Sequence, residues 1–103
     1  MIYEIRYENT EIQEACEQRR VAVKIFGDAG AKRLGRRVKE LQTSPDAATL
    51  RQGPGGWHPI KFDWPGCQAG SITGSKRIVV QPIETDNGQP GWLVRCLGDC
   101  YDH

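Results

Sequence analysis

The chain has 103 residues, a formal net charge of +1 and four cysteines, with 38% hydrophobic and 26% charged residues. This composition is typical of a globular protein, and the length fits a single domain over residues 1–103. No apolar run approaches the ~20 residues of a membrane span, and the acidic N-terminal segment is unlike a signal peptide. We therefore predict a cytoplasmic protein with no membrane partner and with free thiols, because disulfides are rare in that compartment.

The first half of the chain is predicted to be mainly helical. Residues 1–7 alternate β-forming side chains with a period of two, which predicts a strand. A helix is expected from Thr10 to about Phe26, with its first residue as the N-cap, before a turn over residues 27–30. A second amphipathic helix over about 31–41 should end where Ser44 precedes Pro45, because a residue before proline disfavours helical dihedral angles.

The second half changes to a β pattern. After a short helical turn over residues 45–52, runs rich in β-forming residues are separated by turn-forming residues. These runs are residues 56–64, 69–74, 76–83 and 91–97. The pair Asn87-Gly88 predicts a hairpin between the last two runs. The order β-α-α-β-β-β-β predicts an α+β fold, with two helices packed on one face of a small, twisted, mainly antiparallel sheet.

Charge is unevenly distributed along the chain. Residues 17–40 contain eight basic and three acidic side chains, whereas residues 84–103 contain four acidic side chains and only Arg95 as a basic one. A basic segment can mark a nucleic-acid-binding surface, but a solvated helix face has the same pattern. On charge alone, the solvated helix face is the simpler interpretation.

Both histidines lie close to other groups that suit acid–base chemistry. His58 precedes Lys61 by three residues, and His103, the last residue, follows Tyr101 by two. Imidazoles titrate near neutral pH, so one can accept a proton from a ribose 2′-OH while the other protonates the leaving 5′ oxygen. If the last strand ends near His58, then Lys61 and Arg77 can stabilise the phosphorane, and this route needs no metal or cofactor.

Four segments resemble the HigB branch of the RelE superfamily of bacterial toxins, over residues 29–103. They are AKRLGRRVKELQTSPD (31–46), GWHPIKF (56–62), GSITGSKRIVV (70–80) and the terminal YDH. The chain departs from the family at Ser75-Lys76, where the family usually has Asn-Trp. It departs again at Tyr101-Asp102, which reverses the order of the family's ending Asp-Tyr-His.

This resemblance implies a RelE-like fold and a ribosome-dependent endoribonuclease that cleaves mRNA. It implies three partners: mRNA on the ribosome, ribosomal RNA and a cognate antitoxin, typically with a helix-turn-helix. By position in the motifs, the implied catalytic residues are His58, Lys61, Arg77, Tyr101 and His103. The basic side chains expected to contact RNA or the ribosome are Lys32, Arg33, Arg36, Arg37, Lys39 and Lys76.

Two other functions fit the same sequence. One is a non-catalytic RNA- or protein-binding module, in which the altered segments at residues 75–76 and 101–102 have removed activity. The other is a small zinc-binding protein that uses Cys67, Cys96, Cys100 and His103. Structural zinc sites usually have two separated cysteine pairs, and this chain has one such pair, so reduced buried thiols are the simpler expectation.

Overall fold

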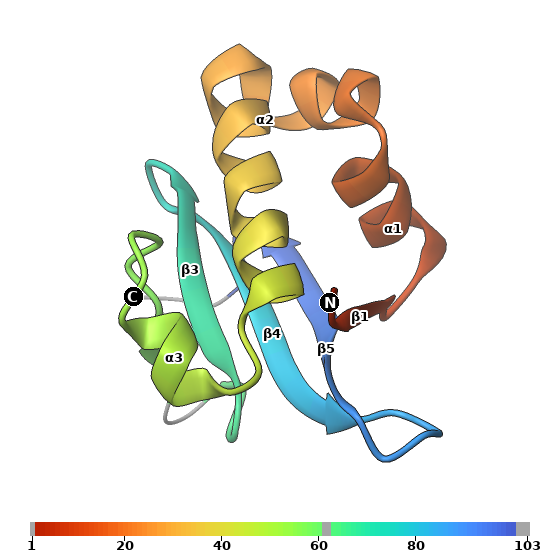
Figure 1. Cartoon of the computed structure of the whole chain (residues 1–103). Coiled ribbons are helices and arrows are strands. Elements are labelled where there is room, and N and C mark those ends of the chain that lie inside the picture. The colour runs from red at the N-terminus through yellow and green to blue at the C-terminus, as the bar shows by residue number, and fades with distance from the viewer. Residues whose placement is uncertain (1, 61–62, 101–103) are drawn as a thin grey trace.

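The structure is a computed structural model that describes residues 2–60 and 63–100 (Figure 1). The helices in these ranges are α1 (Thr10–Glu17), α2 (Arg19–Thr43) and α3 (Ala47–Arg51). The strands are β1 (Glu4–Tyr7), β2 (His58–Pro59), β3 (Gln68–Thr73), β4 (Lys76–Glu84) and β5 (Pro90–Gly98). The predicted α+β class is confirmed, and the short helical turn expected before the β-rich half is helix α3. None of the described helices is both long enough and apolar enough to cross a membrane.

The strands of the described residues form one mixed sheet in the order β1-β5-β4-β3-β2. β1 runs parallel to β5, and every other neighbouring pair is antiparallel, so the mainly antiparallel character is confirmed. The predicted hairpin joins β4 to β5, and the backbone N–H of Thr85 donates to the carbonyl of Gln89 at 2.8 Å. Gly88 in this turn has a φ of 74°, a conformation that glycine adopts without strain.

Helix α1 begins at Thr10, as predicted, but its N-cap and its end differ from the prediction. Asn9 is the N-cap in place of Thr10, because its side-chain oxygen accepts a hydrogen bond from the backbone N–H of Ile12 at 2.9 Å. The helix ends at Glu17, where the extended backbone of Gln18 separates it from α2. The helix predicted to run from residue 10 to residue 26 is therefore two helices.

Helix α2 has the predicted end, but the turn predicted over residues 27–30 is reduced to a break at one residue. Gly27 has a φ of 77° and a ψ of 176°, so the helix is interrupted there and resumes directly afterwards. The C-cap is Ser44, whose extended backbone agrees with the restriction that Pro45 imposes on it. Asp46 then caps α3 by accepting a hydrogen bond from the backbone N–H of Thr49 at 2.8 Å.

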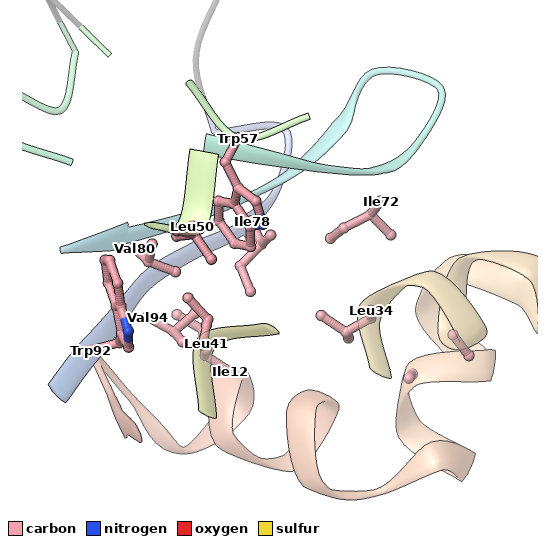
Figure 2. Close-up of a cluster of buried hydrophobic side chains, with 12 residues drawn as sticks. Ile12, Leu34, Leu41, Leu50, Trp57, Ile72, Ile78, Val80, Trp92 and Val94 are labelled. Atoms are coloured by element: carbon pink, nitrogen blue, oxygen red, sulfur yellow. The ribbon is translucent and has the colours of Figure 1, made fainter. Parts of the chain in front are cut away.

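The main core lies between the helices and one face of the sheet, here called the helix face (Figure 2). Leu34 and Leu41 of α2 are fully buried, and they pack in the same cluster as Ile78 and Val80 of β4. Ile12 brings α1 into this cluster, so α1 and α2 cover the same face, as predicted. Burial of such side chains is the main stabilising contribution in a domain of this size.

The opposite face of the sheet, here called the far face, carries the residues that alternate with this core. In β4, Arg77 and Val79 alternate with the core residues Ile78 and Val80, so they point away from the helices. Residues that pair directly across antiparallel strands share a face. By register, the far face therefore carries His58, Ala69, Ser71, Arg77, Val79 and Cys96.

A register shift in β5 affects which side chains reach the far face. Val79 pairs with Cys96 but the next residue, Val80, pairs with Val94, so Arg95 is an extra residue in β5. This β-bulge keeps Val94 in the core while Cys96 lies on the far face.

Candidate functional site

His58 and Arg77 lie on the far face, on either side of β3. His58 pairs with Ala69, and Arg77 pairs with Ser71, two residues further along the same strand. Two strand spacings of about 4.8 Å and a two-residue offset of about 6.6 Å put their Cα atoms about 12 Å apart. An imidazole and a guanidinium on these two Cα atoms are long enough to approach one phosphate group between them. The structure thus places on one face of the sheet the two predicted catalytic residues that it describes.

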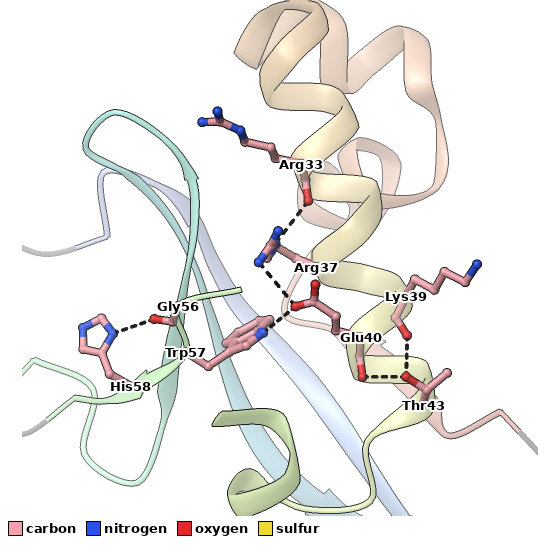
Figure 3. A network of polar contacts seen from close by, with 8 residues as sticks. All are labelled: Arg33, Arg37, Lys39, Glu40, Thr43, Gly56, Trp57 and His58. Atoms are coloured by element: carbon pink, nitrogen blue, oxygen red, sulfur yellow. Dashed lines mark hydrogen bonds and ion pairs between the residues drawn. The ribbon is translucent and has the colours of Figure 1, made fainter. Parts of the chain in front are cut away.

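The imidazole of His58 is exposed, and its Nδ1 lies 3.3 Å from the carbonyl oxygen of Gly56 (Figure 3). In the tautomer with hydrogen on Nδ1, the ring donates to this carbonyl and keeps Nε2 as a proton acceptor. The contact therefore suits a histidine that exchanges a proton with a substrate through Nε2.

The backbone just before His58 is fixed by a polar network that joins it to α2 (Figure 3). Trp57 is buried, and its Nε1 donates to Oε1 of Glu40 at 2.8 Å. The same carboxylate oxygen lies 3.4 Å from Nη1 of Arg37. Gly55 packs so closely here that a Cβ would collide with all three side chains. Trp57 therefore belongs to the core, and its hydrogen bond anchors the segment that carries His58.

Arg37 does not lie on the basic surface predicted for it. Its exposed fraction is only 7%, and its Nε donates to the backbone carbonyl of Arg33 at 3.4 Å. It follows Leu34 by three residues and precedes Leu41 by four, so helical spacing already put it beside the apolar stripe. The basic surface of α2, as defined from here on, consists of the exposed residues Lys32, Arg33, Arg36 and Lys39.

The polar side chains at the turn between β3 and β4 already have partners. Nζ of Lys76 lies 2.7 Å from Oδ2 of Asp99, and the Ser75 hydroxyl donates to Oδ1 at 3.3 Å. The hydrogen bond and the charge of Lys76 lower the pKa of the Asp99 carboxyl. Nη1 of Arg77 donates to the carbonyls of Gly74 at 2.7 Å and of Lys76 at 2.9 Å. Lys76, predicted to contact RNA, is thus paired with a carboxylate of its own chain.

The chain beyond β5 returns over the far face. Cys100 forms a disulfide with Cys96, and its carbonyl accepts a hydrogen bond from Nε1 of Trp64 at 2.8 Å. Its Sγ lies 3.6 Å from the carbonyl oxygen of Arg77. Cys100 precedes His103 by three residues. The C-terminal end of the described chain is therefore held beside Arg77 and beside the loop that follows β2.

This disulfide corrects the prediction that the thiols are free. Cys16 and Cys67 are free thiols, and burial raises the pKa of both, to about 12 for Cys16. The alternative of a zinc site loses two of its four ligands, because the sulfurs of Cys96 and Cys100 are bonded to each other. In residues 2–60 and 63–100, no group of three or more side chains is arranged to hold a metal ion.

Two residues that the sequence patterns do not predict organise the far face. The guanidinium of Arg95 lies 5.2 Å from the centre of the Trp64 ring. Arg95 is also held by Oε1 of Gln81 at 3.0 Å and by the carboxylate of Glu8 at 3.5 Å. No periodic pattern signals this contact, because Trp64 lies in a loop and Arg95 is the extra residue of a bulge.

Three predicted catalytic residues, Lys61, Tyr101 and His103, lie outside the described residues. Comparison with known proteins adds no family assignment: no family model matches the chain, and no curated protein matches it. The resemblance to the HigB branch therefore stands on the four sequence segments alone.

Proposed function

We propose that this protein is a ribosome-dependent endoribonuclease toxin with a RelE-like arrangement, kept inactive in the cell by a cognate antitoxin. The observation that carries the proposal is the shared far face of His58 and Arg77, with Cys100 held beside the Arg77 carbonyl. Cys100 leads into the terminal His103. The four segments that resemble the HigB branch support the same reading.

The proposed reaction is an internal transfer that needs only acid–base groups and positive charge. One of the two imidazoles, of His58 or His103, removes the proton of a ribose 2′-OH, and the 2′ oxygen attacks the phosphorus. The bond from phosphorus to the 5′ oxygen breaks as the other imidazole protonates that oxygen. Lys61 and Arg77 stabilise the negative charge of the phosphorane, and Tyr101 supplies a further hydrogen bond. The products are a 2′,3′-cyclic phosphate and a 5′-OH end.

Part of the Arg77 guanidinium is available to bind a phosphate. Both of its hydrogen bonds to the turn use Nη1, and neither Nε nor Nη2 has a hydrogen-bond partner among the described residues. These two nitrogens form the fork that binds two phosphate oxygens at once. The contacts of Nη1 then serve to orient this fork.

The basic surface of α2 is proposed to contact ribosomal RNA. Its four side chains lie on the helix that covers the helix face, whereas His58 and Arg77 lie on the far face. A large target that surrounds the protein can contact both sides, and phosphate contacts contribute affinity without sequence preference. This arrangement supports a proposal in which cleavage takes place on the ribosome, and it predicts poorer cleavage of short free RNA.

Substitution of His58 tests the proposal. On ribosomes programmed with a labelled mRNA, His58→Ala should slow cleavage ~10²–10⁴-fold, the usual contribution of an acid–base group. Its free energy of unfolding should change by less than about 0.5 kcal/mol because the side chain is exposed. Gln52→Ala, at another exposed position, serves as the matched control. Unchanged cleavage by His58→Ala contradicts the proposal.

The chemistry of the products gives a second, independent test. Wild-type cleavage should leave cyclic phosphate ends, and it should persist after treatment with EDTA once magnesium is restored for the ribosome. A 5′-phosphate end requires water as the nucleophile and contradicts the mechanism. Deletion of His103 should reduce cleavage by a factor similar to that of His58→Ala.

A non-catalytic RNA-binding module remains the second candidate function. The observation that favours it is that two carbonyls already bind Nη1 of Arg77, which holds part of the guanidinium at the turn. Such a module would bind ribosomes and leave mRNA intact. Ribosome binding without new RNA ends, in wild-type protein and in His58→Ala alike, distinguishes it from the endoribonuclease.

A further inference from the structure

We propose that Trp64 and the Cys96–Cys100 disulfide form a clamp that holds Cys100, the last residue of the described chain, on the far face, and that a dithiol reductant opens this clamp. Trp64 is then a positioning residue that acts through the main chain of Cys100. The consequence for catalysis rests on the proposed function, because it concerns His103. The clamp itself is a property of described residues and does not depend on that function.

The indole of Trp64 is held on its ring face and at its edge. The guanidinium of Arg95 lies over the ring at 5.2 Å, and Nε1 donates to the carbonyl of Cys100 at 2.8 Å. Arg95 is in turn fixed by Gln81 on β4 and by Glu8. A cation over an indole and a hydrogen bond from its N–H use separate parts of the ring, so both restrain it at once.

Two consecutive residues after β5 are tethered to different parts of the molecule. Asp99 binds Ser75 and Lys76 at the turn between β3 and β4, and Cys100 is bonded to Cys96 on β5 and to Trp64 in the loop before β3. The ion pair of Asp99 is exposed, and such pairs contribute little. The covalent bridge is therefore the strongest tether, and the indole hydrogen bond orients the carbonyl of Cys100.

These tethers also give a physical role to Ser75 and Lys76, which depart from the family pattern. Both side chains bind the carboxylate of Asp99. The chain thus has, at these two positions, groups that hold the segment leading to its C-terminus.

Reduction of the bridge is a balanced thiol–disulfide exchange. A thiolate of the dithiol attacks one sulfur, the bond between Cys96 and Cys100 breaks, and a mixed disulfide forms. The second thiol of the reductant then displaces the remaining cysteine, so the reductant becomes a cyclic disulfide and both cysteines become thiols. Both cysteines are only half-buried, so a small dithiol can reach them. Cys100 then keeps only non-covalent contacts.

The three tryptophans provide an internal comparison for the test. Each indole N–H has a different acceptor: Glu40 for Trp57, the Cys100 carbonyl for Trp64 and the Ser44 carbonyl for Trp92 at 2.9 Å. Full-length protein labelled with ¹⁵N-tryptophan therefore reports on the clamp and on the core in one spectrum. Trp64→Phe identifies the Trp64 signal and removes the donor while keeping an aromatic ring.

Hydrogen exchange of the three indole N–H groups, with and without dithiothreitol, tests the clamp. Reduction should shift the Trp64 signal and speed its exchange roughly tenfold, as expected for the loss of one hydrogen bond, while the other two signals stay unchanged. The double substitution Cys96→Ser with Cys100→Ser should reproduce this state and should not respond to dithiothreitol. Unchanged exchange at Trp64 overturns the proposal, and so does an equal change at all three tryptophans.

Cleavage measurements separate this inference from the proposed function. In the same protein forms, reduction and Trp64→Phe should each lower kcat on saturated ribosomes by roughly 10²-fold, the cost of misplacing a catalytic group by about 1 Å, with KM little changed. The double serine variant controls for effects of dithiothreitol on the ribosome. Cleavage that is present but insensitive to the clamp overturns the positioning role. If Trp64 responds to reduction but no form cleaves mRNA, the clamp is supported and the endoribonuclease proposal fails.

Discussion

The two faces of the sheet carry different kinds of stabilising interaction. On the helix face, side chains from α1, α2 and α3 bury a continuous apolar cluster that includes Leu34, Leu41 and Val80. On the far face, one indole, one guanidinium and one disulfide hold a loop and Cys100 in place. We expect the apolar cluster to contribute most of the folding free energy, and the far-face contacts to fix the positions of Trp64 and Cys100. Substitutions on the two faces should therefore affect different measurements.

The largest effect on stability is expected on the helix face. Leu41 is fully buried, so Leu41→Ala should lower the free energy of unfolding by roughly 2–5 kcal/mol through lost burial and a cavity. Ile25 is 56% exposed, and Ile25→Ala should change it by less than about 0.5 kcal/mol. Urea unfolding followed by circular dichroism measures both values. Equal effects for the two variants would show that the apolar cluster is not the main source of stability.

The helix face is also the part of the fold that the sequence predicted best. Leu34 and Leu41 repeat at helical spacing, and Ile78 and Val80 alternate with Arg77 and Val79, so local periodicity alone indicates which side chains face the helices. The Asn87-Gly88 turn is predictable for a similar reason, because the preference of this residue pair for a hairpin turn depends only on a few neighbouring residues. Each of these features depends on residues that are close in sequence.

The far face was predicted less well because its contacts join distant residues. The hydrogen bond from Trp64 to Cys100 spans 36 residues and depends on the path of an irregular loop. The Cys96–Cys100 disulfide was missed because the thiols were assigned from the expected compartment and not from geometry. The prediction that Arg37 contacts RNA from an exposed surface is wrong for a different reason. It gives the charge of the side chain more weight than its place beside the apolar stripe of α2.

Removal of the disulfide is the matching test on the far face. The bridge links residues only four apart, and loop-closure entropy for so short a loop gives about 2 kcal/mol. We therefore expect the double substitution Cys96→Ser with Cys100→Ser to lower the free energy of unfolding by about that amount. Urea unfolding in the absence of reductant measures the change. A loss well above about 2 kcal/mol would mean that the bridge contributes more than loop closure and that the two faces do not differ as described.

Alkaline pH should destabilise the protein through groups packed against the helix face. Burial raises the pKa of Tyr7 and of Cys16, each to about 12 in the folded protein, from 10.0 and 9.0 respectively. As the pH rises, the unfolded chain therefore releases these protons before the folded protein does. The contribution of the two groups to the free energy of unfolding is complete below about pH 9 and is lost as the pH rises towards 12. The cysteine alone should cost about 1 kcal/mol between pH 8 and pH 10. Thermal unfolding across this range should show a smaller decrease in Tm for Cys16→Ala than for the wild type, and equal decreases would contradict the assignment.

The smallest effect on stability, but a specific effect on binding, is expected for the basic surface of α2. Lys32 and Arg36 are exposed, so Lys32→Gln with Arg36→Gln should leave the free energy of unfolding within about 0.5 kcal/mol of the wild type. If each side chain neutralises one RNA phosphate, the slope of log K against log salt for ribosome binding should fall by roughly 2. Turnover on saturated ribosomes should change far less than binding, since the pair lies on the helix that covers the opposite side of the sheet from His58. Arg19→Gln with Arg20→Gln removes the same charge from exposed positions before the break at Gly27. An equal change in slope for both pairs would show that net charge, and not this surface, determines binding.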